Sequence, residues 1–462
     1  MKMTLDTIKK LYFLGIGGIG MSALARYFNS RGIEIHGYDK TPTPLTKTLT
    51  AEGMIIHYEE DIDQIPEGVD LVIYTPAVPK SHQEYQFFEK KGIPIKKRAE
   101  VLGLISRSQR TIAIAGTHGK TSTTTILTHL LKAGGIDCTA FLGGISENYG
   151  SNYVAGQSDW VVVEADEYDR SFLHLTPDIA VILSMDADHL EIYGDHQNML
   201  QTGFNEFVKN VKPDGTILVQ HELAQLFDNQ QVETFGVDDG DFRAMRVGVV
   251  EGGFHFDFTQ GRKSHYLTRV NPHFWTPLPG RHNVENALAA MAVATKLGVD
   301  MVDLRRGLRS FKGIKRRFEF IIREEEMVFI NDYAHHPTEL TATITAAKEL
   351  FPNKKITGIF QPHLYSRTRD FQDDFAVALD LLDDCLLLDI YPAREKPIQG
   401  ITSSWLLDKM NIENKQLTTK QKVIDDVLKS DAKIVVLIGA GDIGLLVDDI
   451  KVKLEEKYNV LT

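Results

Sequence analysis

The sequence predicts an α/β protein built from three consecutive α/β domains. Apolar segments of strand length alternate with helix-compatible segments along most of the 462 residues, which favours mostly parallel sheets with crossover helices. Glycine-rich turns follow two of the strands, each before a helix, as in nucleotide-binding α/β folds. Two segments interrupt the alternation: a polar linker at Ser106–Arg110 and a Lys- and Arg-rich hinge at Phe311–Arg317.

The composition is that of an ordinary globular enzyme, with 43% hydrophobic and 25% charged residues. The formal net charge of −12 argues against a nucleic-acid-binding surface. Cys138 and Cys385 lie far apart, so neither a disulfide framework nor a cysteine metal cluster is expected. The segment Met1–Lys10 is polar and unlike a secretory signal, and no apolar run reaches membrane-spanning length. We therefore expect a cytoplasmic protein without membrane insertion.

A glycine loop follows the first predicted strand. That strand is Lys10–Leu14, a helix runs from Met21 to about Ser30, and a second strand, Glu34–Tyr38, ends on Asp39. Strand, glycine turn, helix and an acidic residue 19 positions after Gly20 match the dinucleotide-binding fingerprint. Further strands of this domain are expected at Leu71–Tyr74 and Ile93–Lys96.

This loop alone does not identify its ligand. A helix N-terminus can bind a pyrophosphate and a carboxylate can bind a ribose or a base, and both NAD and a UDP-sugar offer these groups. A purely structural glycine turn is a third interpretation. A similar turn, Gly439–Gly444, follows the apolar run Lys433–Ile438, but no acid-bearing strand comes after it. A tight connection between strand and helix is the better interpretation there.

A second glycine loop carries a lysine. The β-branched apolar strand Thr111–Ala115 breaks into Gly116-Thr-His-Gly-Lys-Thr121, and a helix-compatible segment follows. This context is typical of a phosphate-binding loop, whose backbone N–H groups contact phosphate oxygens. Lys120 would neutralise the β- and γ-phosphates, and the Thr121 hydroxyl would ligate Mg²⁺. Ile114 stands where the general pattern has its first glycine, so the loop is a shortened form. An ordinary strand–turn–helix is the alternative.

Carboxylates follow the next apolar strands. The strand Trp160–Val163 runs into Glu164-Ala-Asp-Glu-Tyr-Asp169, and the strand Ile179–Met185 ends in Asp186-Ala-Asp-His189. Ligands bind at the carboxyl ends of parallel strands, so a carboxylate here would hold Mg²⁺ near the phosphate loop. A solvated acidic loop is the alternative, and His189 is either structural or a metal or phosphate contact.

The remaining chain completes the second domain and forms the third. From Gly215 to about Val270, short strands with Gly and Asp turns predict an antiparallel appendage, and a helix follows from Asn283 to about Leu297. Asn283 is either the N-cap of that helix or a nucleotide contact. The strands of the third domain are expected near Met327–Asn331, Ile356–Phe360, Cys385–Ile390 and Ile434–Ile438.

Two polar blocks follow strands of the third domain. The block Asn331–Glu339 enters a helix at Pro337, and its adjacent histidines would not face one way on a helix, so a two-histidine zinc site is not expected. The block Gln361–Asp370 is either a basic helix face or an arginine fork for a carboxylate or a phosphate.

Together, these motifs resemble the Mur ligase family along the whole chain. The matching blocks are Gly15–Gly20, Ala115–Thr121, Glu164–Glu167, Asp188–His189, His282-Asn283 with Asn286, Arg316–Phe318, Asp332–Glu339, Gln361–Arg369 and Tyr391–Arg394. The last three blocks resemble the alanine-adding branch, rather than the relatives that add glutamate, diaminopimelate or a dipeptide. The resemblance implies Rossmann-like N- and C-terminal domains around a central P-loop ATPase-type domain, with bounds 1–107, 108–314 and 315–462.

The resemblance also implies an activity: ATP- and Mg²⁺-dependent ligation of L-alanine to the lactyl carboxylate of UDP-N-acetylmuramate, through an acyl phosphate, in peptidoglycan precursor synthesis. The implied ATP-binding residues are Gly116, Thr117, His118, Gly119, Lys120, Thr121, Ser122, Asn286, Arg316 and Asp332. Lys120, Glu164 and His189 would be catalytic, and the Mg²⁺ ligands would be Thr121, Glu164 and His189. UDP-sugar contacts would come from Gly15, Gly17, Gly18, Ile19, Gly20, Asp39, Thr75 and Ala77, and amino-acid contacts from His336 and Arg367.

Two positions depart from the family pattern. Several relatives carry a carbamylated lysine after the histidine, and the segment Leu190–Val208 contains no lysine, as expected of the alanine-adding branch. Leu364 occupies a position that is often basic, so no role in binding the amino-acid carboxylate is expected of it. A murein tripeptide-recycling ligase and an NAD-dependent oxidoreductase are the alternative functions, and a monomer or homodimer is expected.

Overall fold

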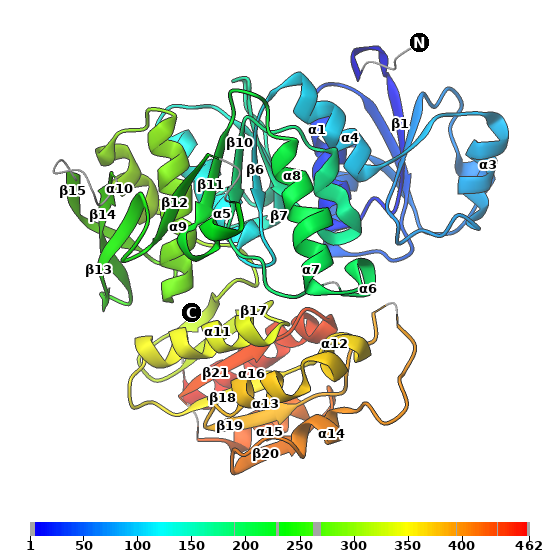
Figure 1. Cartoon of the computed structure of the whole chain (residues 1–462). Helices are drawn as coiled ribbons and strands as arrows, with labels where there is room; N and C mark the ends of the chain where they lie inside the picture. The colour runs from blue at the N-terminus through cyan, green and yellow to red at the C-terminus, as the bar shows by residue number, and fades with distance from the viewer. Residues whose placement is uncertain are drawn as a thin grey trace. The chain divides into compact units, whose positions relative to one another are not determined.

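A computed structural model describes residues 5–188, 190–227, 231–261, 269–393, 395–431 and 433–459. It contains three sheets, one in each of the three predicted α/β regions (Figure 1). By its internal contacts the chain forms two compact units. The first comprises residues 1–245, 257–272 and 285–311, and the second comprises 246–256, 273–284 and 312–462.

The first sheet has five parallel strands in the order β3-β2-β1-β4-β5. Its strands are β1 (Lys10–Leu14), β2 (Glu34–Tyr38), β3 (Ile55–His57), β4 (Leu71–Tyr74) and β5 (Ile95–Lys97). Its helices are α1 (Ile19–Asn29), α2 (Pro44–Ala51), α3 (Gln83–Lys91) and α4 (Arg98–Ser108), with short 3-10 turns η1 (Leu5–Thr7) and η2 (Ile62–Gln64). The order in which successive strands are added to the sheet reverses between β1 and β4, and ligands bind at such a switch point.

Both faces of the first sheet are buried, because alternate side chains enter two different cores. Leu11 and Phe13 of β1 face a cluster that includes Phe28 of α1 and Ile105 of α4. Tyr12 faces the other side, against α3. The cluster around α1 and α4 continues without interruption into side chains of the second sheet, which explains why the two sheets share one compact unit.

The second sheet has ten strands in the order β15-β14-β13-β12-β11-β10-β6-β9-β7-β8. The strands are β6 (Arg110–Ala115), β7 (Thr139–Ser146), β8 (Ser151–Val154), β9 (Trp160–Ala165), β10 (Ile179–Ile182), β11 (Thr216–Gln220), β12 (Val232–Val237), β13 (Phe242–Val250), β14 (Gly253–Gln260) and β15 (Arg269–Thr276). The helices are α5 (Lys120–Ala133), α6 (Leu190–Tyr193), α7 (His196–Met199), α8 (Asn205–Lys209), α9 (Arg281–Lys296) and α10 (Met301–Ser310), with η3 (Tyr168–His174), the π-turn η4 (Leu200–Phe204) and η5 (His221–Phe227).

Two expectations for this region were wrong. The first strands after Gly215 do not belong to an antiparallel appendage, because β11, β12 and β13 continue the sheet from β10 with parallel pairings. The polar segment Ser106–Arg110 is not a linker either. Helix α4 extends to Ser108 and β6 begins at Arg110, so polarity there reflects a helix end rather than a flexible connection.

The third sheet lies in the second compact unit and has the order β16-β17-β21-β18-β19-β20. Apart from the antiparallel edge strand β16, its pairings are parallel. The strands are β16 (Glu319–Arg323), β17 (Val328–Asp332), β18 (Ile356–Phe360), β19 (Asp384–Leu387), β20 (Asn414–Leu417) and β21 (Ile434–Ile438). The helices are α11 (Pro337–Leu350), α12 (Tyr365–Asp370), α13 (Gln372–Leu379), α14 (Ser403–Leu407), α15 (Val423–Lys429) and α16 (Val447–Tyr458), with η6 (Asp442–Leu446).

Helices cover both faces of the third sheet. Side chains of α11, α13 and α14 pack on one face, and those of α15 and α16 pack on the other. Figure 1 shows α11 and α13 lying along the same side of the strands. Within the described part of the chain, no helix has the length and apolar character needed to cross a bilayer.

Candidate functional site

The lysine-bearing glycine loop joins β6 to α5, as the sequence predicts. Helix α5 begins at Lys120, and Gly119 before it has a φ of +83°. Gly116 has a φ of +142°, and a Cβ there would lie 2.9 Å from the backbone N of Ser184. Glycine is therefore required at Gly116 both by conformation and by space. The loop places the first N–H groups of a 14-residue helix at its end, the arrangement that binds phosphate.

Ser184, which follows β10, holds this loop from the neighbouring strand. Its backbone carbonyl accepts a hydrogen bond from the Thr117 N–H (3.1 Å), and its Oγ accepts one from the His118 N–H (2.8 Å). The Thr117 hydroxyl in turn accepts from the Asp186 N–H (3.1 Å). The sequence offered no signal for Ser184, because its role depends on β10 and β6 being parallel neighbours.

Lys120 is largely buried and paired with a carboxylate. Its Nζ donates to both oxygens of Glu167, at 2.9 and 2.7 Å, and to the Gly116 carbonyl at 2.6 Å. Burial alone would lower the pKa of Lys120, but the charges of Glu167 and Asp166 outweigh it, so the pKa is raised. The lysine therefore stays cationic, with Glu167 next to the position predicted for ATP phosphates.

The predicted metal-binding oxygens lie next to each other. The Thr121 Oγ1 donates to Glu164 Oε2 at 3.2 Å, and the other Glu164 oxygen accepts from the Gly143 N–H. A hydroxyl and a carboxylate are the donors that Mg²⁺ prefers, so these two residues fit that ion. His189, the third predicted ligand, lies outside the described residues. Among the described residues, no group of three or more His, Cys, Asp or Glu side chains is arranged to hold a metal by itself.

Asn286 of α9, which the sequence predicts to bind ATP, contacts the phosphate loop. A Cβ on Gly119 would lie 2.4 Å from Asn286 Oδ1, and the same oxygen accepts a hydrogen bond from the Thr123 hydroxyl at 3.2 Å. Asn286 is 8% exposed. The side chain therefore lies against the loop backbone instead of pointing into solvent.

The N-terminal glycine loop is shaped by Asp39. One Asp39 oxygen accepts from the Gly17 N–H (2.7 Å) and the other from the Thr41 N–H (3.2 Å). Gly15 has a φ of +85°, and a Cβ there would lie 2.6 Å from Thr75 Cγ2. The predicted contact residue Asp39 thus also fixes the loop, and Thr75 packs against it from the end of β4.

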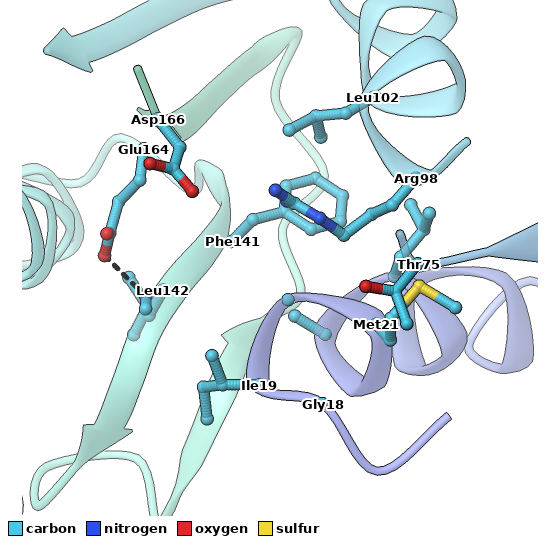
Figure 2. A pocket seen from close by; sticks show the side chains of 14 residues that line it. Gly18, Ile19, Met21, Thr75, Arg98, Leu102, Phe141, Leu142, Glu164 and Asp166 are labelled. Carbon is cyan, nitrogen blue, oxygen red and sulfur yellow. Dashed lines mark hydrogen bonds between the residues drawn. The ribbon is translucent and has the colours of Figure 1, made fainter. Parts of the chain in front are cut away.

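A cavity of about 290 Å³ lies between the N-terminal glycine loop and the carboxylates at the end of β9. It is lined by Gly18, Ile19, Gly20, Met21, Ala23, Leu24, Thr75, Arg98, Leu102, Phe141, Leu142, Gly143, Glu164 and Asp166. Figure 2 shows the start of α1 and Arg98 on one side and Glu164 with Asp166 on the other. The structure thus brings together residues predicted for the UDP-sugar and for Mg²⁺, whereas Gly15, Gly17, Asp39 and Ala77 do not line this cavity.

A buried amide fixes α1 on the second sheet. Asn152 of β8, fully buried, donates to the Ile19 carbonyl and to Ser22 Oγ, and its own oxygen accepts from Arg26. Arg26 also forms a two-oxygen pair with Glu52 at 2.8 Å. Because each polar group in this network is satisfied, the network stabilises one position of α1.

In the second compact unit, Arg316 and Asp332 are held by backbone groups. Arg316 donates to the carbonyls of Gly439 (2.6 Å) and Gly441 (3.2 Å), and its guanidinium lies 4.7 Å from the Tyr333 ring. Asp332 accepts from the N–H groups of Phe318 (2.6 Å) and Ala334 (2.7 Å). Burial raises the pKa of Asp332 despite these bonds. The Gly439–Gly444 turn, expected to be a tight connection, also binds the Arg316 side chain through its backbone carbonyls.

The residues predicted for the amino acid lie at the carboxyl ends of β17 and β18. His336 caps α11, since its Nδ1 accepts from the Thr338 N–H at 3.4 Å, a capping role that the sequence did not reveal. Arg367 of α12 is 7% exposed, with Nη1 3.5 Å from His363 Nδ1. The His336 ring packs edge-on against Phe371, one helical turn beyond Arg367. Glu395 anchors the start of α12 by accepting from Ser366 N–H and Oγ.

Models of one protein family match all three regions of the chain. The model described as "Mur ligase family, catalytic domain" matches residues 10–110, "Mur ligase middle domain" matches 114–294, and "Mur ligase, glutamate ligase domain" matches 316–446. A relative from Flavobacterium psychrophilum named UDP-N-acetylmuramate–L-alanine ligase is 49% identical over 459 residues, covering 98% of this chain and 100% of the relative. One of the same name from Christiangramia forsetii is 48% identical, with 97% and 98% coverage.

Solved structures show the same similarity. The UDP-N-acetylmuramate–alanine ligase of Thermotoga maritima has a TM-score of 0.82 and 30% identity, covering 97% of this chain and 99% of that chain. A murein peptide ligase of Psychrobacter arcticus has a TM-score of 0.71, with 98% and 99% coverage. At 24% identity, that second likeness shows the fold alone.

Proposed function

This chain belongs to the Mur ligase family, and from that premise we propose that it is an ATP-dependent ligase that joins L-alanine to the lactyl carboxylate of UDP-N-acetylmuramate. The reaction supplies a peptidoglycan precursor and takes place in the cytoplasm. The name shared by relatives at 48–49% identity over nearly the full length supports the alanine-adding activity.

The reaction proceeds in two steps. The lactyl carboxylate attacks the γ-phosphate of ATP, so that an acyl phosphate forms and ADP leaves. The neutral amine of L-alanine then attacks the acyl carbon, and the carbon–oxygen bond to phosphate breaks. Inorganic phosphate leaves with the bonding pair and takes up the proton that the nitrogen loses as the amide forms. The protein contributes mainly position and charge to the first step, because phosphoryl transfer needs little covalent help.

Residues of the phosphate loop serve the ATP side. Lys120 meets the β- and γ-phosphates, and doing so requires its Nζ to exchange contacts with Glu167 for contacts with phosphate oxygens. Thr121 and Glu164, already in contact, would hold Mg²⁺ together with His189. When bound, the ion neutralises phosphate charge. Asn286, Arg316 and Asp332 bind the rest of the nucleotide.

One observation carries the proposal: a single cavity is lined both by the start of α1 and by Glu164. Thr121 of the phosphate loop hydrogen-bonds the same Glu164. A sugar nucleotide held at the glycine loop by Gly18, Ile19, Gly20 and Thr75 would therefore extend its lactyl group toward the γ-phosphate. Arg367, with His336 nearby, binds the carboxylate of L-alanine.

The alternative functions explain less. An NAD-dependent oxidoreductase would use the first glycine loop but leaves the Lys120–Glu167 pair and the Thr121–Glu164 contact without purpose. A murein tripeptide-recycling ligase shares the fold, yet the relatives at 48–49% identity carry the name of the alanine-adding enzyme.

The test is phosphate release from ATP with Mg²⁺, UDP-N-acetylmuramate and one amino acid or peptide at a time. We expect release with L-alanine, weaker release with L-serine or glycine, and none with the murein tripeptide. Release driven by the tripeptide would establish the recycling ligase instead. Hydride transfer with NADH, and no release with any amino acid, would restore the oxidoreductase.

A further inference from the structure

Arg98 lines the cavity, and the reaction proposed above gives it no role. It is the first residue of α4 and lines the cavity beside α1. A Cβ on Gly20 would lie 3.0 Å from Arg98 Nη1 and 3.1 Å from Cζ, so the guanidinium passes directly over the first turn of α1. Figure 2 shows this side chain reaching into the cavity from the α4 side.

Within the described part of the chain, the Arg98 side chain forms no hydrogen bond or ion pair. Its neighbour Lys97 pairs with Asp169 at 2.7 Å, and Arg26 of α1 pairs with Glu52 at 2.8 Å. The Arg98 guanidinium is half-buried and carries five N–H donors, yet no carboxylate of the described residues pairs with it, in contrast to Lys97 and Arg26. It fits an anion brought by a ligand.

The backbone next to Arg98 also offers donors. The Gly17 N–H is taken by Asp39, and the Ser22 N–H bonds the Gly18 carbonyl as the first bond of α1. The N–H groups of Ile19, Gly20 and Met21 therefore have no acceptor within the helix, and no side chain caps it. The residues that carry these groups line the cavity together with Arg98, whose guanidinium lies next to Gly20.

The opposite wall of the cavity is negative. Glu164 and Asp166 lie there, and they repel a substrate that carries a pyrophosphate and a carboxylate. Among the described residues that line the cavity, Arg98 carries the positive side chain, so it adds a full positive charge to the N–H groups at the start of α1.

We propose that Arg98 is a substrate-binding residue whose guanidinium, together with the first N–H groups of α1, binds the pyrophosphate of the sugar nucleotide. This inference rests on the proposed function and extends it to a residue that carries no glycine-loop or metal-site motif. The pyrophosphate is the anion assigned because Arg98 lies over Gly20, at the helix end, whereas Glu164 marks the far side where the lactyl group reacts.

The test titrates UDP-N-acetylmuramate and UDP-N-acetylglucosamine, which lacks the lactyl carboxylate, into the full-length protein with Mg²⁺ and a non-hydrolysable ATP analogue. The variants are Arg98→Gln, Arg98→Lys and the control Arg107→Gln, an exposed arginine near the other end of α4. For each variant, the affinity for the ATP analogue and the melting temperature show whether the protein is folded. We expect Arg98→Gln to weaken both sugar nucleotides by the same factor, on the order of 10- to 100-fold, with ATP unchanged. Arg98→Lys should recover only part of the loss, and Arg107→Gln should bind as wild type.

Two results would overturn the assignment. Unchanged affinity of Arg98→Gln for both sugar nucleotides would remove Arg98 from the site. A loss confined to UDP-N-acetylmuramate would move Arg98 to the lactyl carboxylate. A wild-type protein that binds neither sugar nucleotide would instead contradict the proposed function, whatever Arg98 does.

Discussion

Lys120 Nζ lies 2.7 Å from Glu167 Oε2, so this carboxylate contacts the same ammonium group that we propose binds the ATP phosphates. The pair ties the phosphate loop to the segment that follows β9. Lys120 balances a buried carboxylate in the folded protein, and the proposed function gives it a second, separable role, the stabilisation of phosphate charge during the reaction.

Lys120→Ala should abolish phosphate release, with kcat lowered on the order of 10²-fold or more, because a preorganised charge on the phosphates is lost. The substitution should also lower the free energy of unfolding by about 3–5 kcal/mol, since Glu167 is left buried and unpaired. The double variant Lys120→Ala/Glu167→Gln should regain much of the stability but none of the activity. Activity near the wild-type level in either variant would contradict the assignment.

Gly18→Val should weaken binding of UDP-N-acetylmuramate and spare ATP. A Cβ on Gly18 would meet its nearest protein atom at 3.6 Å, an ordinary contact, and the valine methyl groups beyond it would block the ligand's approach to the helix end. The melting temperature of the variant reports whether it is folded. Calorimetric titration of both ligands checks this. Measurable NAD binding to the wild type, without UDP-sugar binding, would favour the oxidoreductase.

Arg367→Lys should raise the KM for L-alanine nearly as much as Arg367→Ala, because the lysine keeps the charge but loses the bidentate fork. The expected rise is on the order of 10- to 100-fold, with the KM values for ATP and UDP-N-acetylmuramate changed far less. Arg369→Gln is the matched control, since Arg369 is half exposed and pairs with Asp370 at 2.7 Å. An unchanged alanine KM in both Arg367 variants would place the carboxylate elsewhere, with Arg369 or Arg394 next. Arg394 lies outside the described residues.

Gly444→Ala should disturb ATP binding through Arg316. A Cβ at Gly444 would lie 3.0 Å from Arg316 Cζ, while Arg316 is held on its other side by the carbonyls of Gly439 and Gly441. We expect a several-fold rise in the KM for ATP and an unchanged KM for L-alanine. Leu445→Ala, at a side chain 79% exposed, should leave both values unchanged. Equal behaviour of the two variants would show that the turn does not position Arg316.

Glu84 should make the protein less stable as the pH rises from about 4.5 to 7. The carboxyl is fully buried and accepts a 2.6 Å hydrogen bond from Tyr12, and desolvation by burial raises its pKa from the ordinary 4.5 to about 7. Below pH 4.5 the Glu84 carboxyl is protonated in both the folded and the unfolded chain. Between the two values only the unfolded chain loses the proton, so the free energy of unfolding falls with rising pH, by on the order of 3 kcal/mol.

Glu84→Gln should remove that dependence. The variant should be more stable than the wild type at pH 8 and no more stable at pH 4. Glu89→Gln, exposed on the same helix α3, is the control. Chemical denaturation at both pH values gives the comparison, and equal pH slopes in wild type and Glu84→Gln would show that Glu84 is ionised in the folded state.

The parts of the site that the sequence predicted are those encoded locally. The phosphate loop is a strand, a turn and a helix in one stretch, so Gly116, Lys120 and Thr121 could be found from their spacing. Ser184, Glu167 as the partner of Lys120, and Arg98 depend on which strands and helices become neighbours, information that no short window contains. The wrong antiparallel prediction for β11–β13 has the same cause, because glycine- and aspartate-rich turns look alike in hairpins and in parallel connections.

The buried contact between Asn152 and α1 has a consequence for the chemistry. The residues assigned to the sugar nucleotide and those of the phosphate loop belong to one compact unit, so their spacing is set when the protein folds. A carboxylate and a phosphate held in a fixed geometry within one compact unit react at a high effective molarity, without a further loss of translational freedom. Folding therefore covers in advance part of the entropy that bringing the two reacting groups together would otherwise require. The buried polar network around Asn152 is the part of the fold that fixes this spacing.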